Sequence, residues 1–162
     1  MCLSEKEFLE QIRSHQAIIY KVVNLYASDA EERKDLYQEV VLQCWKGWES
    51  FRGESKFSTW LYRVSLNTVF TAKRKKNRID YPEHAPEEVG VGPSVLENER
   101  AEVLYAAIRR LPETDRAIIT LHLDGYGNQE IAEMMGITAN SINVKLFRIR
   151  ERLSNLLIPR NV

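Results

Sequence analysis

The chain has 162 residues, of which 23 are basic and 23 acidic, so its formal net charge is zero. A balanced charge excludes a protein that coats nucleic acid over its whole surface and restricts such binding to local basic patches. Apolar residues make up 44% of the chain, which is typical of a folded protein, and the length suits one ordinary domain or two small ones.

Cysteine and histidine usage excludes further classes. The two cysteines, Cys2 and Cys44, are far apart and lack Cys-x-x-Cys spacing, so we expect neither a disulfide framework nor a zinc site. There is no paired nucleophile and base motif and no Gly-rich phosphate loop, so we expect neither an enzyme nor a bound cofactor. No apolar run has the length of a membrane span and no signal-peptide pattern opens the chain, which predicts a cytoplasmic protein without membrane insertion.

Capping residues mark the first two predicted helices. Ser4 with the glutamate three residues later is a capping-box signal, and it opens a helix expected to continue to Tyr26. Asp29, also followed by a glutamate at the third position, caps a second helix that ends near residue 48. The apolar residues of this helix recur with the 3.6-residue period of one buried face: Leu36, Val40, Cys44 and Trp48.

The opposite side of the second helix carries a mixed stripe of Asp35, Gln38, Glu39, Leu42 and Lys46. A solvated face rarely places a leucine among charged side chains, whereas a protein-docking surface combines an apolar anchor with charges that set the register. From the residues alone, both a solvated face and a docking surface remain open.

Turn residues at 49–55 break the second helix before a third, expected over 57–78. Arginine and asparagine side chains on this third helix can make paired hydrogen bonds to base edges. Its basic end, residues 73–78, suits phosphate contact, but cations also complement a helix C-terminus without any ligand. The predicted buried side contains Phe57, Trp60, Leu61, Val64 and Thr68, and the other faces carry Arg63, Asn67, Thr71 and Arg74.

Proline, glycine and unopposed acidic residues break the periodicity at 79–93, which predicts a linker. The residues themselves favour an acidic, solvated tether between one domain over 1–78 and another over 94–162.

The second domain ends in a helix-turn-helix pattern. Ser94 with Glu97 opens a helix through residue 111 with Val103 on its apolar side, and another helix covers 113–123. A short helix, a turn at Gly136 and a long basic helix capped by Thr138 then follow. Many helical hairpins share such a glycine turn, so the pattern alone does not establish DNA binding. The predicted buried side of the long helix is Ile142, Leu146, Ile149, Leu153 and Leu156.

Runs in both halves resemble the extracytoplasmic-function (ECF) group of the sigma-70 family of RNA polymerase sigma factors. The runs Asp35-Leu-Tyr-Gln-Glu-Val and Phe51-Arg-Gly-Glu-Ser-Lys-Phe-Ser-Thr-Trp-Leu-Tyr-Arg-Val are similar to region 2. The run Gly136-Ile-Thr-Ala-Asn-Ser-Ile-Asn-Val-Lys-Leu-Phe-Arg, preceded by Gln129-Glu-Ile-Ala, is similar to region 4. The resemblance implies an all-α protein of two small helical domains joined by a flexible linker.

The resemblance also implies partners and residue roles. The implied partners are the RNA polymerase core, through its beta-prime clamp helices and beta flap, promoter DNA, and an anti-sigma factor. Core docking is implied for Asp35, Gln38, Glu39 and Leu42. Contact with the downstream (-10) promoter element, including capture of a flipped base by residues 51–56, is implied for Phe51, Arg52, Lys56, Arg63, Asn67, Thr71 and Arg74. Contact with the upstream (-35) element is implied for Asn140, Ser141, Asn143, Val144, Lys145, Phe147 and Arg148.

The last predicted helix departs from the family pattern. Asn140, Asn143, Val144 and Lys145 stand where the family usually has Gly, a basic residue, Ser and Arg. Asn143 lacks a charge for a phosphate or guanine contact, and Val144 offers an apolar face, for example to a thymine methyl group. The alternative function is a helix-turn-helix regulator that binds DNA without polymerase, and that function leaves residues 35–78 unexplained.

Overall fold

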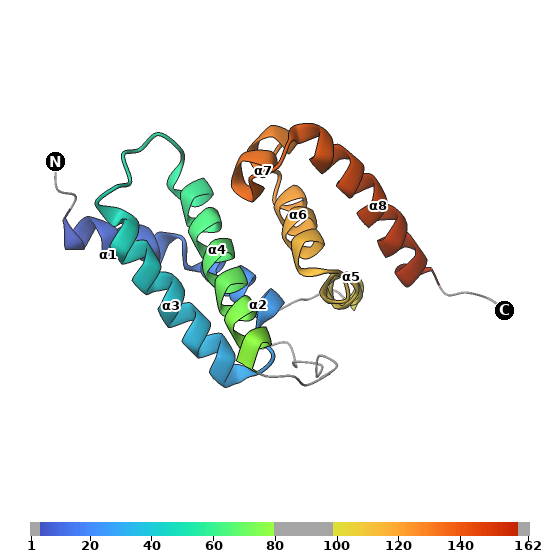
Figure 1. Ribbon diagram of the computed structural model, residues 1–162, viewed down its shortest axis with the longest axis horizontal. Coiled ribbons are helices and arrows are strands. Elements are labelled where there is room, and N and C mark those ends of the chain that lie inside the picture. Colours follow the sequence, from blue (N-terminus) through green and yellow to red (C-terminus); the bar gives the residue numbers. More distant parts are fainter. Residues whose placement is uncertain (1–3, 80–98, 159–162) are drawn as a thin grey trace. The chain divides into compact units, whose positions relative to one another are not determined.

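A computed structural model describes residues 4–79 and 99–158. The chain divides into two compact units, unit 1 within residues 1–91 and unit 2 within residues 92–162. The described residues form eight α-helices and no strand, which confirms the all-α prediction (Figure 1). The predicted linker began at residue 79, but Ile79 is the last residue of α4. The rest of the predicted linker, 80–93, and the capping box of Ser94 with Glu97 lie outside the described residues.

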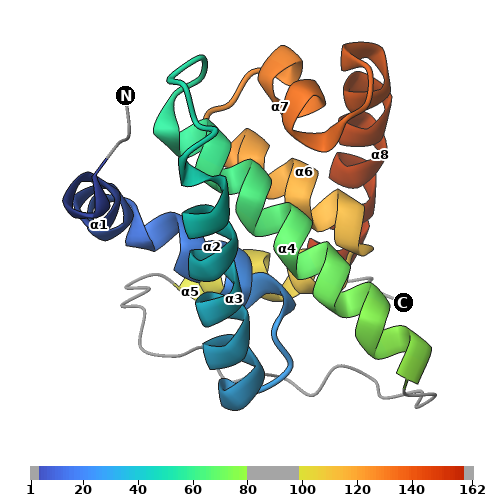
Figure 2. The ribbon, with the colours of Figure 1, turned by 60° about the vertical axis from the view of Figure 1, so that its left-hand side comes forward.

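Unit 1 consists of α1 (Glu5–Ser14), α2 (Gln16–Tyr26), α3 (Ala30–Trp48) and α4 (Phe57–Ile79). Helix α4 packs against both α2 and α3, and α1 packs against α3 (Figure 2). The predicted buried face of α3 is confirmed, and α2 completes the core between α3 and α4. The core side chains from these two helices are Ile19, Val22, Val23, Leu25, Tyr26, Leu36, Val40, Cys44 and Trp48.

The predicted first helix is two helices, because the backbone leaves the helical region at His15 with φ −120° and ψ 17°. The capping box of Ser4 and Glu7 is confirmed at its start. At the break, the Ser14 hydroxyl donates to the Glu10 carbonyl oxygen and His15 Nδ1 lies 2.9 Å from the Gln11 carbonyl oxygen. A continuous helix would pair the Gln11 carbonyl oxygen with the His15 backbone N–H, but here that N–H donates to the Ile12 carbonyl oxygen and the His15 ring nitrogen lies at the Gln11 oxygen instead. The break lets α1 cover α3 while α2 enters the core.

The predicted buried side of α4 is wrong in part. Phe57, Trp60 and Val64 are half-buried, although Leu61 and Thr68 are buried as expected. Helix α4 faces two neighbours at once, so its buried side is wider than one stripe and is turned toward them. It consists of Leu61, Tyr62, Ser65, Leu66, Thr68 and Val69.

Unit 2 consists of α5 (Glu99–Arg109), α6 (Glu113–Leu123), α7 (Asn128–Met135) and α8 (Ala139–Leu157). Helix α8 packs against the other three. The turn at Gly136 has φ 71°, a left-handed conformation that favours glycine. Thr138 caps α8 by accepting a hydrogen bond from the Ser141 backbone N–H. The first four predicted buried positions of α8 are confirmed, but Leu156 and the α5 residue Val103 are exposed.

Candidate functional site

The α3 stripe, which consists of Asp35, Gln38, Glu39 and Leu42, is fully on the surface of unit 1. It lies opposite the buried face of α3, and Leu42 is 44% exposed despite being apolar. Trp45, three residues beyond Leu42, is also exposed and contacts Phe8 of α1 edge-on, with ring centroids 5.0 Å apart. The exposed apolar surface therefore continues past the stripe. The sequence could have indicated this extension, because Trp45 is three residues from Leu42 and so lies on the same side of a helix.

The α4 row, which consists of Arg63, Asn67, Thr71 and Arg74, is exposed as predicted. Spacings of four, four and three residues place these side chains along one side of the helix. The row is attached to the same packed unit as the α3 stripe, because α3 and α4 are in direct contact. Unit 1 thus holds an acidic and apolar surface and a basic and amide-bearing surface on adjoining helices.

The segment between α3 and α4 is held by aromatic packing. Phe51 stacks on Trp48 with ring centroids 5.8 Å apart and an interplanar angle of 14°, and its ring lies 5.1 Å from that of Trp60. A Cβ added to Gly47 would lie 3.2 Å from Trp60 Cζ2, so glycine permits the close approach of this ring to α3. The predicted base-capturing segment is therefore anchored by Phe51, while Arg52 and Lys56 remain exposed.

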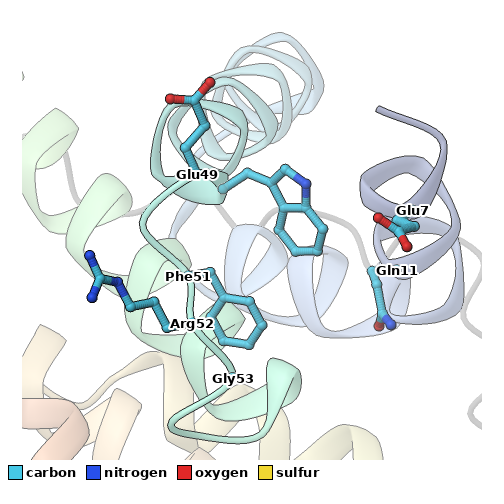
Figure 3. Close-up of a pocket in the computed structure, with 7 residues that line it drawn as sticks. Glu7, Gln11, Glu49, Phe51, Arg52 and Gly53 are labelled. Atoms are coloured by element: carbon cyan, nitrogen blue, oxygen red, sulfur yellow. The ribbon is translucent and has the colours of Figure 1, made fainter. Parts of the chain in front are cut away.

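A pocket of about 640 Å³ lies beside this segment (Figure 3). One wall is formed by Glu7 and Gln11 of α1, and the other by Trp48, Glu49, Phe51, Arg52 and Gly53. In Figure 3 the Phe51 ring faces the pocket, whereas the Arg52 side chain points to the other side of the segment. Of the predicted downstream residues, Phe51 and Arg52 line the pocket, and the α4 row does not.

The basic end of α4 is partly neutralised within unit 1. Lys73 Nζ lies 2.8 Å from Glu32 Oε1, and Lys76 Nζ lies 3.2 Å from Glu32 Oε2. The Glu32 carboxylate also accepts hydrogen bonds from the Ser28 backbone N–H, at 3.0 Å, and from the Ser28 hydroxyl. The basic run contains no acidic residue of its own, and Glu32, which pairs with it, lies more than forty positions away in sequence.

The local environment determines the ionisation of Glu32. Burial by itself would raise the pKa of Glu32, but hydrogen bonds from Lys73 and Ser28 and the positive charge of Lys73 outweigh that effect. Together they lower the pKa from 4.5 to about 2. The carboxylate is therefore charged at neutral pH and joins the start of α3 to the end of α4.

Unit 2 presents the outer face of α8, on the side opposite its buried residues. Among the predicted upstream residues, Asn140, Asn143, Val144, Phe147 and Arg148 are exposed, whereas Ser141 and Lys145 are half-buried. The Ser141 hydroxyl accepts a hydrogen bond from the Thr138 hydroxyl at the start of the helix. Asn143 Oδ1 accepts a hydrogen bond from Asn128 Nδ2 at the start of α7. Sequence reasoning did not single out Asn128, since its relation to Asn143 depends on the turn.

Two arginines of the long basic helix, Arg150 and Arg152, contact α6. Arg150 Nη2 lies 2.9 Å from His122 Nε2, and Arg152 Nη1 lies 4.0 Å from Asp115 Oδ2. The basic character of the outer face is consequently lower than the sequence suggests.

Metal binding and membrane spanning find no support in residues 4–79 and 99–158. No group of three or more His, Cys, Asp or Glu side chains is arranged to hold a metal ion there. None of the helices in this part of the chain combines the length and the apolar character of a membrane span.

Both units match known protein families. The model of sigma-70 region 2 matches residues 11–79, and the model of sigma-70, region 4, matches residues 101–153. The chain is 30% identical to the ECF RNA polymerase sigma-E factor of Haemophilus influenzae, over 96% of this chain and 89% of the relative. It is 28% identical to the ECF RNA polymerase sigma-E factor of Escherichia coli strain K12, over 96% and 88%.

Two solved structures share the fold. The sigma factor RpoE from Bartonella quintana, crystallised with the anti-sigma factor NepR, has a TM-score of 0.81 at 22% identity, covering 96% of this chain and 99% of that one. CnrH, in complex with the cytosolic domain of CnrY, has a TM-score of 0.65 at 17% identity, covering 95% and 89%.

Proposed function

The chain belongs to the ECF group of the sigma-70 family, the RNA polymerase factors that direct transcription initiation, and we propose how its surfaces divide that work. The α3 stripe binds the RNA polymerase core at the beta-prime clamp helices. The α4 row and the segment from Phe51 to Lys56 bind the opened strand of the downstream element. The outer face of α8 binds the upstream element, while unit 2 contacts the beta flap.

One observation carries this division of roles. Unit 1 displays two exposed surfaces of different chemistry on adjoining helices. The α3 stripe combines Leu42 with carboxylates and an amide, which suits a protein partner. The α4 row combines arginines with Asn67, which suits phosphates and base edges.

The pocket beside Phe51 supports base capture. Extruding a base from the duplex costs a few kcal/mol, and stacking on aromatic side chains offsets roughly 1 to 3 kcal/mol per base. The Phe51 ring is already oriented by Trp48 and Trp60, so little side-chain freedom is lost when a base stacks against it.

Run-off transcription with core polymerase tests the division of roles. We expect Asp35→Ala with Gln38→Ala to abolish core binding, and Arg63→Ala with Asn67→Ala to abolish promoter opening while core binding remains. Lys6→Ala, an exposed change on α1 that belongs to neither surface, serves as the control. Normal transcription by both double variants would overturn the assignment. Specific operator binding by the free chain would instead favour a regulator that acts without polymerase.

The proposed role also implies where the chain acts and how it could be regulated. A factor that works on RNA polymerase acts in the cytoplasm, and its part in initiation requires no covalent chemistry of its own. A related fold occurs in complexes with the anti-sigma factor NepR and with the cytosolic domain of CnrY. An anti-sigma factor of this chain would act by covering the α3 stripe or the outer face of α8.

A further inference from the structure

The outer face of α8 is unusually apolar for a DNA-reading surface. Val144 is 44% exposed and Phe147 is 64% exposed, and both lie opposite the buried side of the helix. Arg150 and Arg152 are directed to α6 by their contacts with His122 and Asp115. A guanine in the major groove is most often read by arginine or lysine, which donate to its O6 and N7 acceptors. Arg148 remains exposed on this face and could read a guanine, whereas the side chains of Asn143, Val144 and Phe147 are better suited to other bases.

An amide pair lies at the edge of the same face. Asn128, the first residue of α7, donates from Nδ2 to Oδ1 of Asn143, and the Asn143 side chain is exposed. In this arrangement the Asn128 amide donates and the Asn143 amide accepts, so the oxygen of Asn143 is turned toward Asn128. This contact leaves the Asn143 Nδ2 donor and the second lone pair of Oδ1 available for a ligand.

These two groups match the edge of an adenine. In the major groove adenine presents the N7 acceptor beside the N6 donor, and an asparagine amide binds both. Guanine presents two acceptors there, so Oδ1 of Asn143 would face an acceptor without a hydrogen. The thymine methyl group projects into the same groove and favours apolar contact, which Val144 and Phe147 offer one residue and one turn away.

We propose that Asn143, oriented by Asn128, reads an adenine in the upstream element, and that Val144 and Phe147 read the methyl groups of neighbouring thymines. Asn143 and Val144 are specificity-determining residues, and Asn128 is a positioning residue. The proposal rests on the proposed function, since it assumes that this chain directs polymerase to DNA. The proposal therefore predicts that the upstream element contains an A·T-rich step.

Transcription from a promoter library tests the base preference. Holoenzyme assembled from core polymerase and the full chain transcribes templates randomised over both elements, and the transcripts identify the selected templates. We expect adenine to be favoured over guanine at one upstream pair by on the order of tenfold, the discrimination typical of a bidentate contact. Asn143→Ala removes this preference. Asn155→Ala, which changes another exposed asparagine of α8, leaves it intact.

Two chemical probes separate the contacts. Replacing the selected adenine by 7-deazaadenine removes the N7 acceptor, and we expect transcription to fall with the wild type but not with Asn143→Ala. Replacing the neighbouring thymine by uracil removes its methyl group, and we expect transcription to fall with the wild type but not with Val144→Ser.

A separate variant tests whether Asn128 positions the Asn143 side chain. Asn128→Asp keeps the side-chain shape but cannot donate to Asn143 Oδ1 when ionised. We expect this variant to lose the preference for adenine over guanine while the thermal unfolding of the chain and the downstream preference stay unchanged.

The possible outcomes separate this inference from the proposed function on which it rests. Transcription that depends on the downstream element, with no adenine preference or with one that survives Asn143→Ala, would overturn the inference and leave the proposed function standing. If the uracil substitution lowers transcription equally for the wild type and Val144→Ser, or for neither, Val144 does not read the methyl group. No transcription from any template would overturn both.

Discussion

Replacing Glu32 by glutamine tests the electrostatic contact between the start of α3 and the end of α4. The substitution keeps the size of the side chain but removes the charge that pairs with Lys73 and Lys76. Only 16% of the Glu32 side chain and 17% of the Lys73 side chain are exposed, so the lysine left behind is poorly solvated. An unpaired charge of this kind lowers the free energy of unfolding.

The shift in pKa bounds the magnitude. One pKa unit corresponds to about 1.4 kcal/mol. The pKa of Glu32 falls from 4.5 to about 2, so the charged form contributes at most about 3 kcal/mol. Water around Lys76, whose side chain is 51% exposed, screens part of this contribution. We therefore expect Glu32→Gln to lower the free energy of unfolding of unit 1 by about 1 to 2 kcal/mol at pH 7.

The pH dependence has a definite sign. Because the folded-state pKa is lowered, the contribution of Glu32 is complete above about pH 4.5, the ordinary value. It decreases as the pH falls and is lost once the pH passes through the folded value near 2. The stability difference between wild type and Glu32→Gln should therefore shrink steadily below pH 4.5.

Denaturant unfolding followed by tryptophan fluorescence measures this difference. The three tryptophans, Trp45, Trp48 and Trp60, all lie in unit 1, so the signal reports that unit alone. Glu31→Gln, an exposed change beside Glu32, is the control and should alter stability little. Equal stability of Glu32→Gln and wild type at pH 7, or a difference that does not shrink by pH 3, would refute the reasoning.

Three further predictions concern single sites. Burial raises the pKa of the Cys44 thiol to about 12. In a Cys2→Ser background we therefore expect a thiol reagent to label Cys44 at pH 8 only after denaturant is added, and prompt labelling of the folded chain would contradict this. Leu61→Ala removes a fully buried side chain and should cost about 2 to 5 kcal/mol in denaturant unfolding, whereas the exposed Leu42→Ala should change stability little and reduce core binding. Gly136→Ala places a side chain on a residue with φ 71°, at a position where nothing lies within 4 Å. The loss in the free energy of unfolding, about 1 to 2 kcal/mol, therefore comes from the backbone conformation. We expect faster amide hydrogen exchange in α7 and α8, and unaltered exchange would argue against this reasoning.

Local patterns in the sequence were sufficient for much of the fold. Capping by Ser4, Asp29 and Thr138 depends on hydrogen bonds within three residues, and all three caps are present. The glycine turn at Gly136 likewise follows from the conformation of one residue. The buried face of α3 was predictable because one row of apolar side chains with helical spacing faces a single core.

Contacts between helices were decided by the tertiary structure. Helix α4 is packed on two sides, so the apolar period of its sequence did not reveal that Trp60 would stay half-buried. The break at His15 lets α1 pack against α3 while α2 packs between α3 and α4, although the apolar pattern continues across it.

The candidate surfaces divide in the same way. The sequence by itself determined which residues of the α3 stripe and the α4 row lie away from the core, because helical spacing assigns residues to faces. The tertiary structure alone decided which charges and amides meet: Glu32 with Lys73, Arg150 with His122, and Asn128 with Asn143. Such pairs join residues between 15 and 41 positions apart, and only the packing of one helix on another brings them within hydrogen-bonding distance.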